Sequence, residues 1–417
     1  MPDMNPRAWH RKASRPVSIW MAVFILVGLA HPFIPDGSWL LIHIFTLGIL
    51  TNSIMLWSQN LTERFLGQKL ADASRPAQLT RTYIFNAATI AVLVGQLARW
   101  YWLVWVGAAV VAVVLAWHAA VLVRQVRTAP RRHAGVLGFV ASACCLPVGA
   151  MLGAALSAGL PGQWHSAVRQ AHMFTNVGGF VGFAAMGALS VLFPAMWRTR
   201  GQERVGVALA LAGMGVAVAV AGSLLRLPVV VGAGTVVILA GWVWLYQGFV
   251  ASALTVLKNP RDRVTYPALS ALFAVTWLIG GLTWYAVRLF GGAGEIPTLP
   301  LLLGFAGQLL IGTMSYLMPT TMGGGPAAVK AGLRELNRGA YLRAGLFNAS
   351  LLAWLVVGNS YARIVLSFVA FGVLVAFIPL MTRAVKAQVA VIKSRRPYTS
   401  SPSSCARRWC TTRECLC

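Results

Sequence analysis

The sequence has very few acidic residues. Only nine of its 417 residues are Asp or Glu, and charged residues of both signs make up 11% of the chain. All nine fall outside the long apolar blocks or at their extreme ends. Proton-coupled transporters usually need a buried carboxylate within such a block, so this scarcity argues against that class.

Cysteine is also scarce. Two of the six cysteines, Cys144 and Cys145, are adjacent in one apolar block, where a shared disulfide would be poorly placed, and we expect them to be packing residues. The other four lie in the last thirteen residues, at Cys405, Cys410, Cys415 and Cys417. They match no standard metal-ligand spacing, so no metal site is predicted in the tail.

Long apolar blocks dominate the rest of the chain. Hydrophobic residues make up 58% of it and occur in blocks of about twenty, the length of helix that crosses a hydrocarbon core of roughly 30 Å. The sequence therefore predicts an all-α, polytopic membrane protein with about twelve transmembrane helices. The predicted spans are 17–35, 38–58, 82–98, 101–123, 135–159, 168–196, 205–225, 228–250, 266–288, 299–321, 342–359 and 362–382.

The basic residues fall mainly on one side of these spans. The formal net charge is +26, and 30 of the 35 Lys and Arg residues lie on the side where the chain starts. By the positive-inside rule, both termini of this multi-pass protein are expected to be cytoplasmic, in the cell (plasma) membrane. The basicity then reflects membrane topology, with the lipid bilayer as partner and no nucleic acid.

Three regions are expected along the chain. Residues 1–15 form a basic cytoplasmic N-terminus without a cleavable signal, and residues 16–390 form the transmembrane domain. Residues 391–417 change to Arg, Ser, Pro, Thr and Cys and lose all periodicity. We expect a disordered cytoplasmic tail of the kind an out-of-frame end would produce, and one that is dispensable.

An internal repeat relates the sixth and tenth spans at an offset of 125 residues. Seven of sixteen aligned positions are identical: Gly179, Phe180, Gly182, Gly187, Ser190, Leu192 and Pro194 correspond to Gly304, Phe305, Gly307, Gly312, Ser315, Leu317 and Pro319. Spans 2, 6 and 10 are four helices apart and run in the same direction. This spacing predicts three four-helix arcs, although independent small-residue packing faces would give a similar pattern.

A four-residue phrase with the same pattern occurs twice, as His43-Ile-Phe-Thr46 and His172-Met-Phe-Thr175. Both phrases start a few residues into spans that descend from the outer side, so the two imidazoles are expected at about the same depth. Hydrocarbon offers a histidine no water, so a partner must be supplied. The pair predicts one shared site.

A pair of histidines at one depth suits haem b or copper. Imidazole is a common ligand of both, and His43 and His172 are the predicted metal ligands. Asn176 lies one turn from His172 on the same face, Arg169 about one turn on the other side, and Thr46 at i+3 from His43; these three are expected to support the cofactor site. The alternative is that each histidine makes one interhelical hydrogen bond and nothing more.

Other candidate ligands are weaker. His31 and His165 lie on the same outer side, whereas His118, His10 and His133 lie near the inner side and are poor candidates. A Met stripe on span 10 has the spacing for Cu(I) but is more typical of helix packing. Its members are Met314, Met318 and Met322.

The chain resembles known membrane proteins through these features. The His-x-Phe-Thr phrases, the twelve spans and the Gly-rich end of span 10 at 318–326 resemble the membrane domain of actinobacterial copper-oxidase-like proteins. Residues 16–390 also resemble the NnrS family and, more distantly, subunit I of haem-copper oxidases. The resemblance implies that His43 matches a low-spin haem ligand and that His172 lies on a helix carrying a copper ligand. The counterpart of His172 in span 10 is Pro297, and the paired-histidine motifs of subunit I are absent from the sequence, so oxygen reduction is not implied.

Two functions from different classes follow. The first is a membrane haem or copper protein that handles electrons or a small ligand such as nitric oxide near the outer face, as an oxidoreductase component with a redox partner protein. The second is a transporter, or a membrane anchoring or assembly module, without a redox centre. The lack of a complete catalytic motif keeps the second alternative open.

Overall fold

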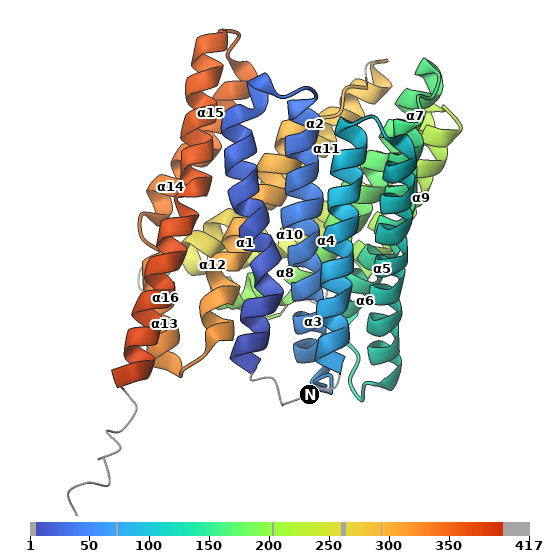
Figure 1. Ribbon diagram of the computed structural model, residues 1–417. Helices are drawn as coiled ribbons and strands as arrows, with labels where there is room; N and C mark the ends of the chain where they lie inside the picture. Colours follow the sequence, from blue (N-terminus) through green and yellow to red (C-terminus); the bar gives the residue numbers. More distant parts are fainter. Residues whose placement is uncertain (1–5, 72–73, 202–203, 260–263, 293, 395–417) are drawn as a thin grey trace, which may run out of the picture.

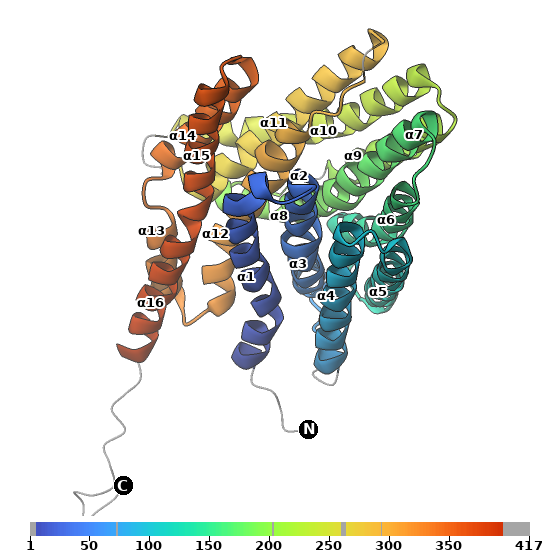
Figure 2. The same ribbon diagram turned by 45° about the horizontal axis from the view of Figure 1, so that its top comes forward.

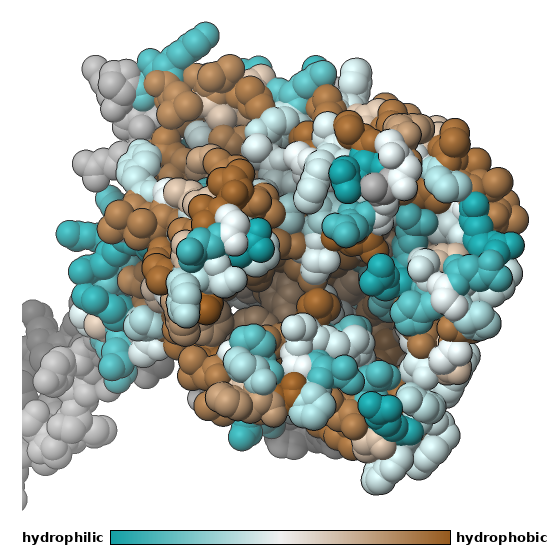
Figure 3. Space-filling view, turned by 90° about the horizontal axis from the view of Figure 1, so that it is seen from above, coloured by the Kyte–Doolittle hydropathy of each residue, from teal (hydrophilic) through white to brown (hydrophobic). Residues whose placement is uncertain are grey.

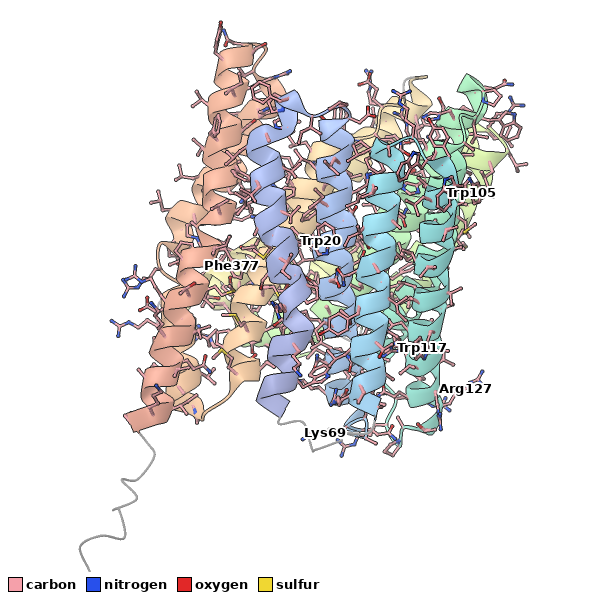
Figure 4. The ribbon with its side chains drawn as sticks, viewed as in Figure 1. Trp20, Lys69, Trp105, Trp117, Arg127 and Phe377 are labelled. Atoms are coloured by element: carbon pink, nitrogen blue, oxygen red, sulfur yellow. The ribbon has the colours of Figure 1, made fainter. Side chains whose placement is uncertain are left out.

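The computed structural model describes residues 6–71, 74–201, 204–259, 264–292 and 294–394, and all secondary structure in these ranges is helical. The predicted all-α class is confirmed. The helices form one bundle, in which α1 begins and α16 ends at the same end (Figure 1). Lys69 and Arg127 lie at that end, which we call the basic end (Figure 4). Residues 1–5 of the predicted N-terminus, and the tail from residue 395 with its four cysteines, lie outside the described residues.

The helices follow one another with short connections. In chain order they are α1 (Pro6–Ala30), η1 (His31–Phe33), α2 (Gly37–His43), η2 (Ile44–Thr51), α3 (Asn52–Leu66), α4 (Arg75–Leu97), α5 (Tyr101–Thr128), α6 (Ala134–Ser157), α7 (Gly162–Met173), η4 (Phe174–Val181), α8 (Gly182–Trp197), α9 (Val205–Leu224), α10 (Pro228–Leu257), α11 (Tyr266–Phe290), η5 (Pro300–Gly307), α12 (Gln308–Met322), α13 (Pro326–Leu336), α14 (Ala340–Val356), α15 (Ser360–Val375) and α16 (Phe377–Ser394).

Ten helical segments of the described chain are long and apolar enough to cross a membrane. They are Lys12–Phe33, Gly37–Leu66, Tyr101–Thr128, Ala134–Ser157, Gly162–Trp197, Val205–Leu224, Pro228–Leu257, Tyr266–Phe290, Pro300–Met322 and Ser360–Ser394. The other two predicted spans correspond to α4, which is not among the ten, and to α14, a shorter apolar helix of 17 residues. A polytopic helical membrane architecture is thus established.

The two ends of the chain differ from expectation. Helix α1 begins at Pro6, so most of the predicted basic N-terminus is helical; Trp9 and Ala13 are buried against Leu79 of α4. At the other end, the twelfth predicted span is divided between α15 and α16, and α16 continues through residues 391–394 of the expected tail. The division follows from Pro379 in the first turn of α16, because proline has no N–H to donate to the preceding turn.

Three of the long helices contain a π-helical turn. The segments η2, η4 and η5 each have eight residues and lead directly into α3, α8 and α12. The segment η4 begins at Phe174 and η5 begins at Pro300. The separation of these two starts differs by one residue from the predicted repeat offset of 125. In η2 the Thr51 hydroxyl donates to the carbonyl of Thr46, five residues earlier, at 2.8 Å. Such π-turns are rare and occur frequently at functional sites.

Two of these turns pack against a tryptophan in the same way. Gly48 of η2 lies against the indole of Trp20, where an added Cβ would come within 2.6 Å of the ring, and Gly304 of η5 lies at the same separation from Trp277. The Nε1 of Trp20 donates to Asn86 Oδ1 at 2.6 Å. The Nε1 of Trp277 donates to the amide oxygen of Asn348, also at 2.6 Å. A tryptophan on the preceding helix and an asparagine on a later helix therefore hold each turn.

The interior of the bundle contains two cavities with apolar linings. Helix α8 lies in the middle, with α4, α5 and α6 on one side and α13 to α16 on the other (Figure 2). A cavity of about 80 Å³ lies between α1, η2, α12, α15 and α16, and another of about 80 Å³ lies between α3, α8 and α12. Both are lined by Ser53, Leu310 and Met314. Seen from the end opposite the basic end, the bundle is hollowed, with hydrophobic residues deep inside (Figure 3).

Candidate functional site

His43 ends α2, where the helix changes to the π-helical segment η2. Its Nδ1 lies 2.8 Å from the carbonyl oxygen of Trp39, one turn earlier. The imidazole also stacks on the indole of Trp39, with ring centroids 4.0 Å apart and planes inclined by 24°. The ring is half-buried and held on one face and at one nitrogen.

His172 occupies the corresponding place in α7, two residues before η4. Its Nδ1 lies 2.9 Å from the carbonyl oxygen of Gly149 on the neighbouring helix α6. The amide nitrogen of Asn176, at i+4, lies 3.1 Å from Nδ1 and 3.2 Å from Nε2 of the ring. Helix α6 can approach this closely because Gly153 has no side chain: a Cβ there would lie 2.9 Å from Cε1 of His172.

These hydrogen bonds fix the protonation pattern of both neutral rings. A backbone carbonyl oxygen can only accept, so Nδ1 is the protonated nitrogen in His43 and in His172. The Nε2 of each ring then carries the lone pair. Metal-bound histidines commonly have this arrangement, in which the second ring nitrogen donates to a carbonyl and orients the ring.

The two predicted histidines interact electrostatically, and the interaction is repulsive when both rings are protonated. His31 and His165, the other histidines predicted on this side, are both exposed. Within the described residues, no group of three or more His, Cys, Asp and Glu side chains is placed to hold a metal ion.

The predicted supporting residues are placed differently from one another. Asn176 lies beside His172, as helix geometry predicts, and its buried Oδ1 has no hydrogen-bond partner. The hydroxyl of Thr46 donates to Ile42 O at 2.8 Å and so satisfies its own helix. Arg169 is exposed and interacts electrostatically with Tyr285. Of the three, only Asn176 makes a hydrogen bond with either histidine.

The Met stripe and His118 contribute to packing and to a polar contact between helices. Met314 and Met318 pack with Met21 and Met381 around the buried Phe377, as expected for apolar packing. His118, which the sequence set aside, is only 3% exposed, and its Nε2 lies 2.9 Å from Ser58 Oγ. The Ser, Gln and Thr residues of α3 could have indicated this polar contact. Hydropathy alone does not distinguish such residues from the polar end of a membrane span.

Compared with models of known protein families and with curated protein sequences, the chain matches none.

Proposed function

We propose that this protein is a membrane haem or copper protein that handles electrons or a small ligand, such as nitric oxide, near its outer face. Haem b or copper would be held by Nε2 of His43 and Nε2 of His172. One observation supports the proposal most strongly: both rings donate Nδ1–H to a backbone carbonyl, which places the lone pair on Nε2 in each ring. The Nε2 of His172 accepts from the Asn176 amide, which a bound metal would displace.

The residues around the pair have distinct tasks in this proposal. Trp39 fixes the plane of the His43 ring by stacking on it, and Gly149 fixes the rotation of His172 by accepting from Nδ1. Asn176 presents its amide to the His172 ring and keeps an unpaired buried oxygen that a bound ligand could satisfy. A bound iron or copper would supply the electron transfer or the binding of a diatomic ligand.

We also propose that about twelve helices cross the membrane in three four-helix arcs. The three π-helical turns, one in each of the long helices formed by α2 and α3, α7 and α8, and η5 and α12, support this arrangement. The paired contacts of Trp20 with Asn86 and of Trp277 with Asn348 also support it. The resemblance to NnrS and to copper-oxidase membrane domains is part of the same proposal.

In this proposal the basic end faces the cytoplasm and the membrane is the plasma membrane. Cysteines introduced one at a time at Gly162 and Gly294, both exposed, should react with a membrane-impermeant thiol reagent on intact cells. Cysteines at Ala129 and Ala327 should react only after the cells are opened. The reverse pattern would contradict the orientation.

The cofactor proposal is tested by purifying the full chain in detergent after expression with haem and copper supplied. We expect either a Soret band or about one copper per chain. Absence of both would overturn the proposal.

A cofactor-free transporter, or an anchoring or assembly module, is the second candidate. The specific observation in its favour is the pair of apolar cavities, each of about 80 Å³, between the helices. Uptake of an apolar substrate by proteoliposomes, or capture of a redox partner by the cofactor-free protein, would support it. Failure of both would leave it without support.

A further inference from the structure

A buried arginine near the basic end forms no ion pair with any residue that the structure describes. Arg81 of α4 is 3% exposed, and its Nε and one terminal nitrogen are buried without a hydrogen-bond partner. Its neighbours include the ring of Trp117, whose centroid lies 5.4 Å from Cζ, and His118, with which it interacts electrostatically. These two nitrogens of Arg81 donate no hydrogen bond to either ring.

The carboxylate of Glu63, on α3, already forms an ion pair with another arginine. Both oxygens of Glu63 accept from the guanidinium of Arg75, at 3.0 and 2.9 Å. Arg75 also donates to Gln78 Oε1 at 3.4 Å. Arg81 lies six residues further along α4, about 9 Å deeper into the bundle at 1.5 Å per residue.

The helices around Arg81 carry further polar groups without partners. Gln59 of α3 donates to Gln125 of α5 at 2.6 Å, yet Gln59 Oε1 and Gln125 Nε2 remain unpaired. The hydroxyl of Thr62, on the same face of α3, is also buried and unpaired. Three adjacent helices thus present unsatisfied polar atoms in one part of the bundle, where each such atom is costly.

We propose that Arg81 anchors a binding site for a small oxyanion between α3, α4 and α5, close to the basic end. The guanidinium presents paired N–H groups in a planar fork, which matches a carboxylate or another planar oxyanion. Such an anion supplies both the missing negative charge and the missing hydrogen-bond acceptor. The site is separate from His43 and His172, which lie towards the opposite end.

The burial of Arg81 favours a free small anion over a lipid headgroup. Arg81 faces the interior of the bundle, and the Trp117 ring, itself partly exposed, lies beside it. Trp117 lies on α5 between Trp105 and Arg127, nearer to the basic end (Figure 4). A phosphate attached to two acyl chains would have to pass between packed helices to reach the guanidinium, whereas a small oxyanion would not.

The test uses the full chain in nanodiscs and radiolabelled formate at constant ionic strength. We expect saturable binding to the wild type, unchanged binding to Arg127→Met, an exposed matched control, and no detectable binding to Arg81→Met. Without formate, Arg81→Met should melt at the same temperature as the wild type or higher, because the substitution removes a charge that no protein group compensates. Saturable binding that survives in Arg81→Met would overturn the proposal, as would no saturable binding to the wild type.

A second variant keeps the test decisive if Arg81→Met does not accumulate. Arg81→Lys retains the charge but loses the fork, and we expect about tenfold weaker formate binding. Unchanged affinity would contradict the site. An acidic lipid that copurifies stoichiometrically with the wild type, is lost from Arg81→Lys and is accompanied by no formate binding would assign the site to a headgroup and reject the free anion. Haem and copper content should not change in any of these variants.

Discussion

The Nδ1 of His172 lies 2.9 Å from the carbonyl oxygen of Gly149, on the helix that precedes it in the bundle. The hydrogen bond joins α6 to α7 at the start of a π-helical turn and sets the direction in which Nε2 points. His43 has the same relationship with Trp39 within its own helix. The orientation of both rings therefore depends on backbone groups, which side-chain substitutions elsewhere leave in place.

The closeness of α6 to His172 gives the first prediction. In Gly153→Ala the new Cβ would lie 2.9 Å from Cε1 and 3.3 Å from Nδ1 of His172, so the ring must turn away from Gly149 O. We expect cofactor affinity to fall about 10- to 100-fold, the usual effect of losing a group that orients a metal ligand. Gly280→Ala in α11 is the control, because its Cβ would meet nothing within 4 Å. Equal cofactor content in the two variants would argue against this role of the hydrogen bond.

The polar contact behind η2 gives the second prediction. Asn86 accepts from Trp20 Nε1 at 2.6 Å and donates to Asn52 Oδ1 at 2.8 Å. Asn86→Ala should lower the stability in detergent by about 1–2 kcal/mol, as expected for buried interhelical hydrogen bonds. The control is Asn60→Ala, since Asn60 donates only to Leu56 O in its own helix. Thermal unfolding of both variants distinguishes the outcomes, and an Asn86 variant as stable as the control would contradict the contact.

The fold was predictable where it depends on hydropathy. A block of about twenty apolar residues specifies a spanning helix because the hydrocarbon core has a fixed thickness. The π-turns were not predictable, because η2, η4 and η5 consist of apolar residue types that α-helices crossing a membrane also contain. Helix α13 was also missed: it is only 11 residues long and lies in a segment expected to be a cytoplasmic connection. Its signal was Pro326 at the first helical position after three glycines.

The candidate site shows a similar division. Helix spacing correctly placed Asn176 beside His172. The shared site that the repeated phrase predicts for His43 and His172 stays a prediction. The carbonyl partners Trp39 and Gly149 could not be predicted, since a backbone acceptor leaves no mark on the residue type. Arg81 was counted only as one of the 30 basic residues on the side where the chain starts. Such a count does not record whether a side chain faces lipid or the interior of the bundle.

His133 gives a pH-dependent prediction outside the membrane-spanning segments. Its Nδ1 accepts from the backbone N–H of Gly135 at 3.1 Å and so caps α6, and partial burial lowers the pKa of His133. The folded state then binds fewer protons than the unfolded state, so the stabilisation is present above about pH 6.5 and is lost as the pH falls through the folded pKa. Between pH 7.5 and 5.5 the wild type should lose more stability than His133→Asn, whose amide caps without titrating. An identical pH dependence would exclude the cap.

The last helix gives the fourth prediction. The side chain of Gln388 is buried and donates to Pro319 O at 2.9 Å and to Gly323 O at 2.7 Å, which caps the end of α12. Gln388→Leu should cost about 1–3 kcal/mol, because both carbonyls lose their donor. Truncation after Lys393 keeps this contact and should leave expression, cofactor content and melting temperature unchanged. A truncated chain that failed to accumulate would show that residues 394–417 contribute to the folded protein.

The central claim is that His43 and His172 hold one cofactor between them. The most direct measurement is the amount of haem or copper bound per chain in His43→Ala and in His172→Ala, purified in parallel with the wild type and with His31→Ala, whose imidazole is exposed and bonded to Gly28 O. We predict that each of the first two substitutions removes the cofactor and that His31→Ala retains the wild-type amount. A full complement of cofactor in either His43→Ala or His172→Ala would contradict the account.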